Sequence, residues 1–227
     1  ITPPSLTIIE PQNKTYSYNT SLELNYTASD LHLQSCWYNL DNGNNISLPD
    51  CQNTTFDTTD GSHTLYLYAN DSLGNTNNTE RVTFFVDSTF PLIDFAGQTP
   101  SNGSYINTDF LIVNVSIIED NVENVTYELY NSTSLVNRTI YYNKVEFINF
   151  TGLIHNVTYF YNVSVVDIVN HKNTTETRSV FVDLIKPLIA YGSGTESDGA
   201  NVSRNWIYVS VSVTESNFAN ITYKLYN

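Results

Sequence analysis

The stretch HNVTYFYNVSVVD, residues 155–167, decides the fold class, because its apolar and aromatic residues recur at every second position. A period of two is that of a β-strand with one buried and one exposed face. The spacing predicts a strand that turns two copies of one triplet, Asn156-Val-Thr and Asn162-Val-Ser, outward and about 20 Å apart. The predicted inward residues are Val157, Tyr159, Tyr161, Val163 and Val165.

A second stretch, LIVNVSII at 111–118, has the same alternation. It predicts that Val113, Val115 and Ile117 are buried while Asn114 and Ser116 face solvent. Both stretches therefore place an asparagine and a hydroxyl residue together on an outer strand face.

The outward triplet Asn-x-Ser/Thr is the acceptor sequence for N-glycosylation. The chain has 30 Asn and 49 Ser plus Thr, so about six or seven such sequons are expected by chance. It holds 18, about three times as many, and we predict glycosylation at these asparagines. They are Asn13, Asn19, Asn25, Asn45, Asn53, Asn70, Asn77, Asn102, Asn114, Asn124, Asn131, Asn137, Asn149, Asn156, Asn162, Asn173, Asn201 and Asn220.

The residue inside many of these sequons supports the glycan hypothesis, because it is Val, Ile or Phe and would fill a core. The alternative is that the asparagines are plain polar decoration of the outer faces. The sequons with an apolar middle residue are those at Asn45, Asn114, Asn124, Asn149, Asn156, Asn162, Asn201 and Asn220.

Composition limits the partners of the chain. The 227 residues carry a formal net charge of −14, with 23 acidic and nine basic side chains. Such a balance argues against nucleic acid or an anionic lipid surface as the main partner. No apolar run approaches the roughly 18 residues of a membrane helix. Because the chain begins at Ile1 and contains no Met, we expect a mature or excised piece.

The fold class predicted from the whole chain is all-β, with tandem immunoglobulin-like β-sandwich domains joined by short linkers. The signal LDNGNN at 40–45 predicts a hairpin in which Asn-Gly takes the positive φ angles. The strands predicted in the first part lie near 5–10, 21–29, 34–40, 45–51, 53–58, 63–70 and 80–86.

Internal repeats predict the domain boundaries. FFVDSTFPLIDF (84–95) and VFVDLIKPLIAY (180–191) match at a spacing of 96 residues, as do NVTYELYN (124–131) and NITYKLYN (220–227). CWYNLDN (36–42) is a more distant copy, and the repeats place Asp71 opposite Asp167. We predict domains at 1–88, 89–184 and 185–227, with linkers at 87–91 and 183–187 stiffened by Pro91 and Pro187.

The third domain is incomplete, since its copy stops after what would be its third strand. We expect excision from a longer chain. The alternative is that strands of a neighbouring subunit complete the domain by β-augmentation, as in fibre assembly.

The repeats resemble immunoglobulin-like repeats of bacterial and archaeal surface proteins. In that family a strand ends in Asp-x-x-Gly-Asn, and the next closes with Phe-x-Val-Asp before a proline-containing linker. Here these motifs are DSLGN (71–75) and FFVD (84–87); the second repeat keeps Asp167 and Val182-Asp183 but has Asn170-His171 in place of Gly-Asn. The resemblance implies stalks, adhesins, surface layers or extracellular filaments, and the dense sequons suggest an archaeal surface glycoprotein.

Cys36 and Cys51 are the only cysteines, and both lie in the first domain. Aligning the repeats on Tyr38, Tyr127 and Tyr223 puts Cys36 in the core, in the place of Val125 and Ile221. We predict a disulfide that stabilises by about 3 kcal/mol in the chain-entropy model, as suits an oxidising exterior. Two buried thiols are the alternative.

No constellation points to catalysis. The four histidines (His32, His63, His155 and His171) are scattered without a nucleophile motif, so we expect them at the surface. Glu119 and Asp120 are adjacent on an extended chain, so they should point apart and be solvated. We therefore predict that the chain is not an enzyme.

No cofactor is predicted besides covalent N-glycans, although calcium at the domain junctions is a weaker hypothesis. Asp87 and Asp183 lie at the junctions, and Asp71 or Asp167 is expected near the same end of a sandwich. The competing interpretation is that Asp71 and Asp167 accept backbone N–H bonds within their hairpins.

Trp37 is out of phase with Cys36 and Tyr38, so it should face away from that core, either packed against a second sheet or covered by a glycan, a neighbouring domain or another subunit. Trp206 is a second candidate contact residue. We expect an extracellular, cell-surface protein that self-associates into a filament or surface layer. The alternatives are an adhesin-type binding module and a non-catalytic spacer of a secreted enzyme.

Overall fold

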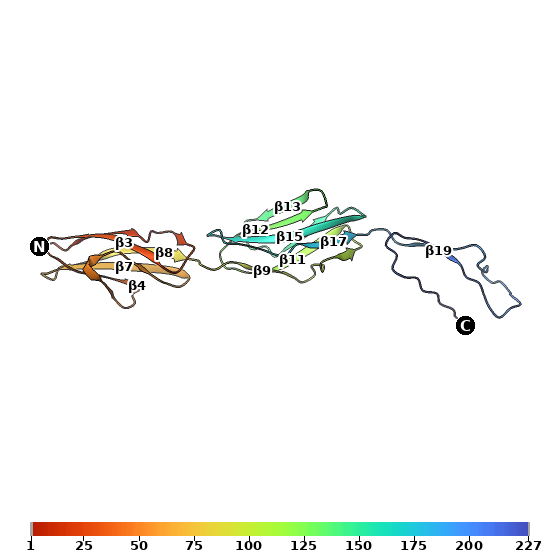
Figure 1. Cartoon of the computed structure of the whole chain (residues 1–227), viewed down its shortest axis with the longest axis horizontal. Coiled ribbons are helices and arrows are strands. Elements are labelled where there is room, and N and C mark those ends of the chain that lie inside the picture. The colour runs from red at the N-terminus through yellow and green to blue at the C-terminus, as the bar shows by residue number, and fades with distance from the viewer. Residues whose placement is uncertain (1, 227) are drawn as a thin grey trace.

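The computed structural model describes residues 2–226, and its regular secondary structure is almost entirely β-strand. Figure 1 shows three units that follow one another along a single axis, with the strands of the two larger units running lengthwise. These two units are β-sandwiches, so the chain is all-β, with tandem immunoglobulin-like domains joined by short linkers. Ile1 and Asn227, the outer ends of the first and third predicted domains, lie outside the described residues.

The first sandwich packs a three-stranded sheet, ordered β1-β3-β6, against a five-stranded sheet, ordered β2-β8-β7-β4-β5. Strands β2 and β8 are parallel, and the other neighbours are antiparallel. The bounds are β1 Ser5–Glu10, β2 Thr15–Tyr16, β3 Leu22–Ser29, β4 Leu33–Leu40, β5 Ile46–Leu48, the 3-10 turn η1 Pro49–Cys51, β6 Thr54–Phe56, β7 Gly61–Asp71 and β8 Thr76–Val86.

The second sandwich repeats this order, with β9-β11-β14 packed against β10-β17-β15-β12-β13. Strands β10 and β17 are again the parallel pair, and the short β16 pairs with β15. The bounds are β9 Leu92–Ala96, β10 Ser104–Ile106, β11 Phe110–Ile118, β12 Val122–Tyr130, β13 Leu135–Tyr141, β14 Phe147–Thr151, β15 Val157–Asp167, β16 Lys172–Thr174 and β17 Arg178–Val182.

The strand predictions for the first sandwich are largely confirmed, with two differences. The strand predicted at 45–51 ends at Leu48, because Pro49 has no N–H to give to a ladder and Asp50 and Cys51 both adopt a φ of 52°. Strand β2 was not predicted, since two residues carry no period; it forms only because Thr15 and Tyr16 meet β8 in space.

The predicted alternation of β15 is confirmed on its inner face. Tyr161, Val163 and Val165 are fully buried in a core that both sheets of the second sandwich line. The first sandwich has a separate core built from the corresponding faces. Each sandwich therefore buries its own apolar surface without help from the other.

Two details of the outer face of β15 differ from the prediction. Asn156 lies in the turn before the strand, with a φ of 63°, so it does not share the strand face with Asn162 as predicted. Ser164 is buried rather than exposed, because it sits in the ladder between Thr126 of β12 and Thr174 of β16. The period of two does not report where a strand begins or which strand flanks it.

Strand β11 matches the prediction for LIVNVSII. Val113, Val115 and Ile117 are buried, Asn114 is half-exposed and Ser116 is exposed. The inner residues belong to the core of the second sandwich.

The predicted hairpin at 40–45 joins β4 to β5, but its turn is displaced by one residue. Asp41 and Asn42, rather than Asn42 and Gly43, adopt positive φ of 53° and 59°. Asp41 is held there because its backbone and side chain both bond Thr64 of the neighbouring strand β7. Tertiary contact therefore selects the turn residues within a sequence that permits more than one choice.

The third unit contains one antiparallel pair, β18 Leu188–Tyr191 and β19 Val211–Thr214. This pair corresponds to β9 and β11 of the second sandwich. The predicted third strand, at 220–227, is not formed over residues 220–226. Its counterpart β12 pairs with β13 and β15, and nothing between residues 188 and 226 takes the place of those two strands.

Among residues 2–226, no helix is long and apolar enough to cross a membrane.

Candidate functional site at the junction between the domains

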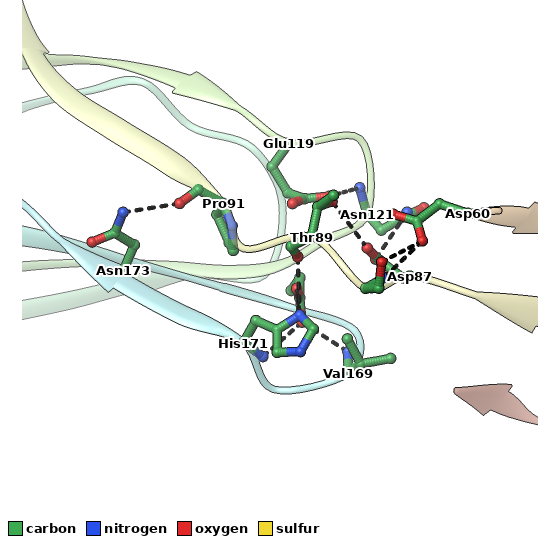
Figure 2. Close-up of polar contacts among 11 residues, drawn as sticks. Asp60, Asp87, Thr89, Pro91, Glu119, Asn121, Val169, His171 and Asn173 are labelled. Atoms are coloured by element: carbon green, nitrogen blue, oxygen red, sulfur yellow. Dashed lines mark hydrogen bonds and ion pairs between the residues drawn. The ribbon is translucent and has the colours of Figure 1, made fainter. Parts of the chain in front are cut away.

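The linker between the sandwiches begins with a buried cluster of two acids and one amide (Figure 2). Asp87 directly follows β8 and is 2% exposed. Asn121, in the loop between β11 and β12, donates its Nδ2 to Asp87 Oδ2 at 3.0 Å and its backbone N–H to Glu119 Oε1 at 2.8 Å. One asparagine thus ties the linker to the second sandwich.

The prediction that Glu119 and Asp120 are both solvated is wrong for Glu119, which is 9% exposed. Glu119 continues the inward phase of Val115 and Ile117 beyond the end of β11, whereas Asp120 is exposed. The backbone N–H of Asn121 gives the buried carboxylate a hydrogen-bond partner.

A hairpin of the second sandwich holds the same linker from another direction. Asp167 is fully buried and accepts backbone N–H bonds from Val169 and His171 at 2.9 and 2.8 Å. The His171 Nδ1 lies 3.0 Å from Asp167 Oδ2 and 2.9 Å from the carbonyl oxygen of Thr89. Its ring stacks on Phe90, with ring centroids 4.2 Å apart.

The first sandwich also binds the linker. Asp60 Oδ1 accepts the backbone N–H of Ser88 at 3.1 Å and the Ser88 hydroxyl at 2.6 Å. The backbone N–H of Asp87 donates to the Tyr16 carbonyl at 2.9 Å. Residues 87–90 are therefore hydrogen-bonded to both neighbouring domains.

The second junction repeats the first at an offset of 96 residues. Asn217 donates its Nδ2 to Asp183 Oδ2 at 3.1 Å and its backbone N–H to Glu215 Oε1 at 2.9 Å. In addition, His155 Nδ1 lies 3.5 Å from Asp183 Oδ1. The same acid–amide arrangement thus occurs twice in the chain.

The hairpins that contain Asp71 and Asp167 are also equivalent, as the repeats predict. Asp71 accepts backbone N–H bonds from Leu73 and Asn75 at 2.9 and 2.8 Å, and the Asn75 side chain at 2.7 Å. The Asn75 side-chain bond, helped by the backbone N–H groups and opposed by desolvation, holds the pKa of the Asp71 carboxyl below its ordinary value. His171 stands in the place of Asn75 in the second repeat.

The calcium hypothesis gains no support from the placement of its four candidate residues. The side-chain carboxylates of Asp71 and Asp167 accept hydrogen bonds from backbone N–H groups of their hairpins, as the competing interpretation predicts. Asp71 lies at the end of β7 opposite to Gly61, whereas Asp87 follows Val86, the partner of Gly61. Over residues 2–226 no three His, Cys, Asp or Glu side chains are grouped so as to hold a metal ion.

Sequence reasoning missed Asn121 and Asn217, although a signal for them is present. EDN (119–121) and ESN (215–217) lie 96 residues apart, at the same offset as the Val-Asp motifs that precede each linker. The contact between Asp87 and Asn121 spans 34 residues, as does that between Asp183 and Asn217. No local pattern reports such a pairing.

The sequon asparagines lie at the surface of the molecule. None of the 18 is buried: nine are exposed and nine are half-exposed. The apolar residues inside four of the sequons, Val115, Val125, Phe150 and Val163, are buried as the alternation requires, whereas Ile46 is 49% exposed. Ile46 is not buried, because β5 is a short strand at the edge of its sheet.

Among the sequon asparagines, Asn77 and Asn173 donate their side-chain Nδ2 to backbone carbonyls. Asn173 donates its Nδ2 to the Pro91 carbonyl, and Asn77, 96 residues earlier, donates to the Pro4 carbonyl, both at 3.0 Å. Each bond joins a strand near the C-terminal end of a sandwich, β8 or β16, to the residue just before its first strand, β1 or β9. In contrast, Asn149 is exposed on β14.

The prediction that the histidines lie at the surface is wrong for His63. His63 is 8% exposed, with Nδ1 2.7 Å from Asp41 Oδ2 and Nε2 3.1 Å from the Thr58 hydroxyl. The set resembles a catalytic triad, but Nε2 lies closer, at 2.8 Å, to the Thr59 carbonyl oxygen. Because a carbonyl oxygen only accepts, Nε2 donates to it and is not free to take a proton from Thr58.

The structure contains the predicted disulfide between Cys36 and Cys51. Cys36 is 1% exposed, and it pairs with Ala69 as Val125 pairs with Val165 in the second sandwich. This register confirms that Cys36 takes the core position of Val125.

The two tryptophans have different surroundings. Trp37 points away from the core, as predicted, and stacks on Tyr68 across the sheet with centroids 5.5 Å apart. Trp206 is 59% exposed, with the Arg204 guanidinium 4.3 Å from its ring centroid. Trp37 therefore packs on a neighbour in its own sheet and not, as one alternative had it, on a second sheet.

Comparisons with known proteins yield fold-level likenesses only. No family model matches the chain, and no curated protein matches it. Solved structures with similar chain paths include the fibronectin(III)-like modules of Clostridium thermocellum CbhA, at 12% identity over 79% of this chain and 94% of that one, with a TM-score of 0.38. Three N-terminal domains of the bacteriophage RB49 outer capsid protein Hoc match at 12% identity over 81% and 70%, with a TM-score of 0.40.

The N-terminal four Ig domains of Dscam1 match at 10% identity over 80% of this chain and 46% of theirs, with a TM-score of 0.41. Because these TM-scores are below 0.5, the fold assignment rests on the strand order of the two sandwiches.

Proposed function

We propose that this chain belongs to a structural extracellular glycoprotein, in which tandem immunoglobulin-like domains coated with N-glycans form an extended stalk or filament at a cell surface. The observation that carries the proposal is the placement of the sequons. All 18 asparagines are accessible, while Val115, Val125, Phe150 and Val163 inside four of the sequons are buried. A sequon count about three times the chance value is thus combined with a fold that buries none of the acceptor asparagines.

The repeated junction supports an extended, load-bearing role. Asp87 with Asn121, and Asp183 with Asn217, hold successive domains in the same way. A chain of domains with one repeated joint gives a rod of uniform geometry. Such a rod suits a stalk or filament better than a catalytic domain, and the proposed role is non-catalytic.

The surface chemistry fits the same role. With only nine basic residues in 227 and 14% charged residues overall, the domains need neutral polar cover to stay soluble. Glycans supply that cover and shield strand edges from unwanted pairing. Nucleic acid is not among the proposed partners, because the net charge of −14 repels phosphate.

Self-association by strand complementation is the proposed route to a filament. The third unit exposes large apolar side chains on and beside β18 and β19, including Leu188, Ile189, Tyr191 and Trp206. Strands from a second copy would cover this face.

Two measurements on native material test the proposal. The intact mass before and after enzymatic deglycosylation should differ by many sugar masses, and electron microscopy should show regular fibres. A native mass equal to the bare 25.6 kDa of this segment would remove the glycan coat from the proposal. Isolated flexible molecules at all concentrations would contradict the filament.

A further inference from the structure

The outer face of the sheet β9-β11-β14 carries four large apolar side chains that are exposed over the part of the chain that the structure describes. We call it the Phe147 face. Its inward neighbours Val113, Val115 and Phe150 fill the core, so the alternate residues point to solvent. Its large apolar members are Leu92, 59% exposed, Phe110, 38%, Ile118, 69%, and Phe147, 62%.

Two complete sequons lie on this same face. Asn114 and Ser116 belong to β11, and Asn149 and Thr151 belong to β14. Asn149, Ser116 and Thr151 are exposed, and Asn114 is half-exposed. Both acceptor sites therefore point in the direction of the exposed apolar side chains.

The register places Phe147 between the two acceptor asparagines. Phe147 is the direct cross-strand partner of Asn114, and Asn149 follows it by two residues on the same strand face. Direct partners lie about 4.5–5.5 Å apart at Cβ, and residues i and i+2 about 7 Å apart. Phe147 is thus a direct neighbour of both attachment points on this face of the sheet.

The chemistry of the first sugar residues suits this neighbour. A pyranose ring has one face of C–H groups, which packs against the face of an aromatic ring much as other apolar groups do. Because the sugar is attached covalently, it loses no translational freedom when it packs. Covering Phe147 also removes apolar surface that a soluble domain would otherwise leave in water.

We propose that the N-glycans of Asn114 and Asn149 fold back over the Phe147 face and that Phe147 is the aromatic platform on which their inner sugars pack. The inference rests on the proposed glycosylation. The opposite sheet shares one part of the arrangement: Phe160 precedes the sequon asparagine Asn162 by two residues, although its cross-strand partner is Tyr130 and not an asparagine. The glycan is thus a structural layer of the domain as well as a solubilising coat.

The test is a double-mutant cycle on secreted, N-glycosylated protein, with glycopeptide mass spectrometry to establish occupancy at Asn114 and Asn149. Phe147→Ala is made in the wild-type background and in Asn114→Gln/Asn149→Gln. A second sequon-free background, Ser116→Ala/Thr151→Ala, keeps both asparagines and guards against misfolding of the first. The control is Tyr142→Ala, which removes an aromatic side chain that is 76% exposed and not part of the Phe147 face.

With both sites occupied, Phe147→Ala should lower the thermal midpoint of the second domain by about 4 °C. In either sequon-free background the same substitution should leave the midpoint nearly unchanged, and Tyr142→Ala should have equal, small effects in all backgrounds. Sequon removal should also increase binding of an apolar dye, and Phe147→Ala should reverse that increase.

The outcomes separate the two proposals. Occupied sites with equal effects of Phe147→Ala in all backgrounds overturn the platform and leave the glycan coat intact. Unoccupied sites overturn both the platform and the glycan coat at this face. Association of the glycosylated wild type that Phe147→Ala abolishes would assign the face to a second copy of the chain and overturn the platform.

Discussion

The Nδ2 of Asn121 lies 3.0 Å from the Asp87 carboxylate, and 96 residues further along, Asn217 stands in the same relation to Asp183 at 3.1 Å. Each pair joins the end of one domain to a loop of the next. A hydrogen bond to a buried carboxylate stabilises by about 1.5–3 kcal/mol, more than a neutral one. The same bond thus occurs at both junctions, and its carboxylate is buried at the first, where Asp87 is 2% exposed.

Loss of this bond should loosen the joint without unfolding the domains. We expect Asn121→Ala to reduce the population of the docked arrangement about tenfold or more, because Asp87 is left buried without its amide partner. Asn121→Asp should act more strongly, since it adds a third carboxylate to the cluster. Small-angle scattering should show a shorter maximum dimension and a broader distance distribution.

The matched control is Asn143→Ala, which removes an exposed asparagine that belongs to no sequon. The joint would not depend on Asn121 if the scattering curves of Asn121→Asp and the control were the same as that of the wild type.

The disulfide should stabilise only the first domain. Replacing Cys36 and Cys51 together by Ala opens a loop with a sequence separation of 15, which should lower the free energy of unfolding by about 3 kcal/mol. Two-transition chemical denaturation of wild type and variant measures this, and the second domain is the internal control. A shift of both transitions would show that the domains unfold as one unit.

Acid should weaken the Asp71 hairpin in a defined direction. The pKa of the Asp71 carboxyl is held below its ordinary value, chiefly by the Asn75 side-chain bond, so the unfolded state binds the proton more readily than the folded state. Its contribution to stability is present above the unfolded pKa near 4 and is lost as pH falls through the lower folded value. Asp71→Asn should flatten the acid limb of the thermal midpoint of the first domain, whereas Asp120→Asn, at an exposed site, should not.

The hydrogen bond of the Tyr127 hydroxyl should contribute measurably to the stability of the second domain. Tyr127 is fully buried, and its hydroxyl donates to the Val145 carbonyl at 2.9 Å. Burial, followed by the charges of Tyr141 and Glu146, raises the pKa of this phenol, which stays neutral. Tyr127→Phe should cost about 1 kcal/mol, or about 4 °C in thermal midpoint. Tyr105→Phe, at a side chain 70% exposed, should cost nothing detectable; equal losses would refute the assignment.

Glycan occupancy should differ among the sequons. Asn77 and Asn173 donate their amide nitrogens to carbonyls inside the fold and are half-buried, so folding competes with sugar attachment there. Asn149, exposed on an edge strand, should be more fully occupied. Site-resolved glycopeptide ratios measure this; higher occupancy at Asn77 and Asn173 than at Asn149 would mean that attachment precedes folding.

The sequence by itself determined the class of the fold and its repetition. A period of two in HNVTYFYNVSVVD is a local property of the chain, because side chains on a strand alternate whatever the strand pairs with. The core positions of Tyr161 and Val163 followed from that rule. Alignment of the repeats placed Cys36 in the core and Asp71 opposite Asp167.

Only the tertiary structure decided the joint, the turn residues and the neighbours of the sequons. Asn121 meets Asp87 across 34 residues, and Phe147 meets Asn114 across a sheet, so neither pairing leaves a local pattern. The turn at Asp41 was set by its bonds to Thr64, and the burial of Ser164 by the ladder beside it. Periodicity tells which side of a strand a residue faces, but the contacts it makes there depend on which segments chain folding brings alongside.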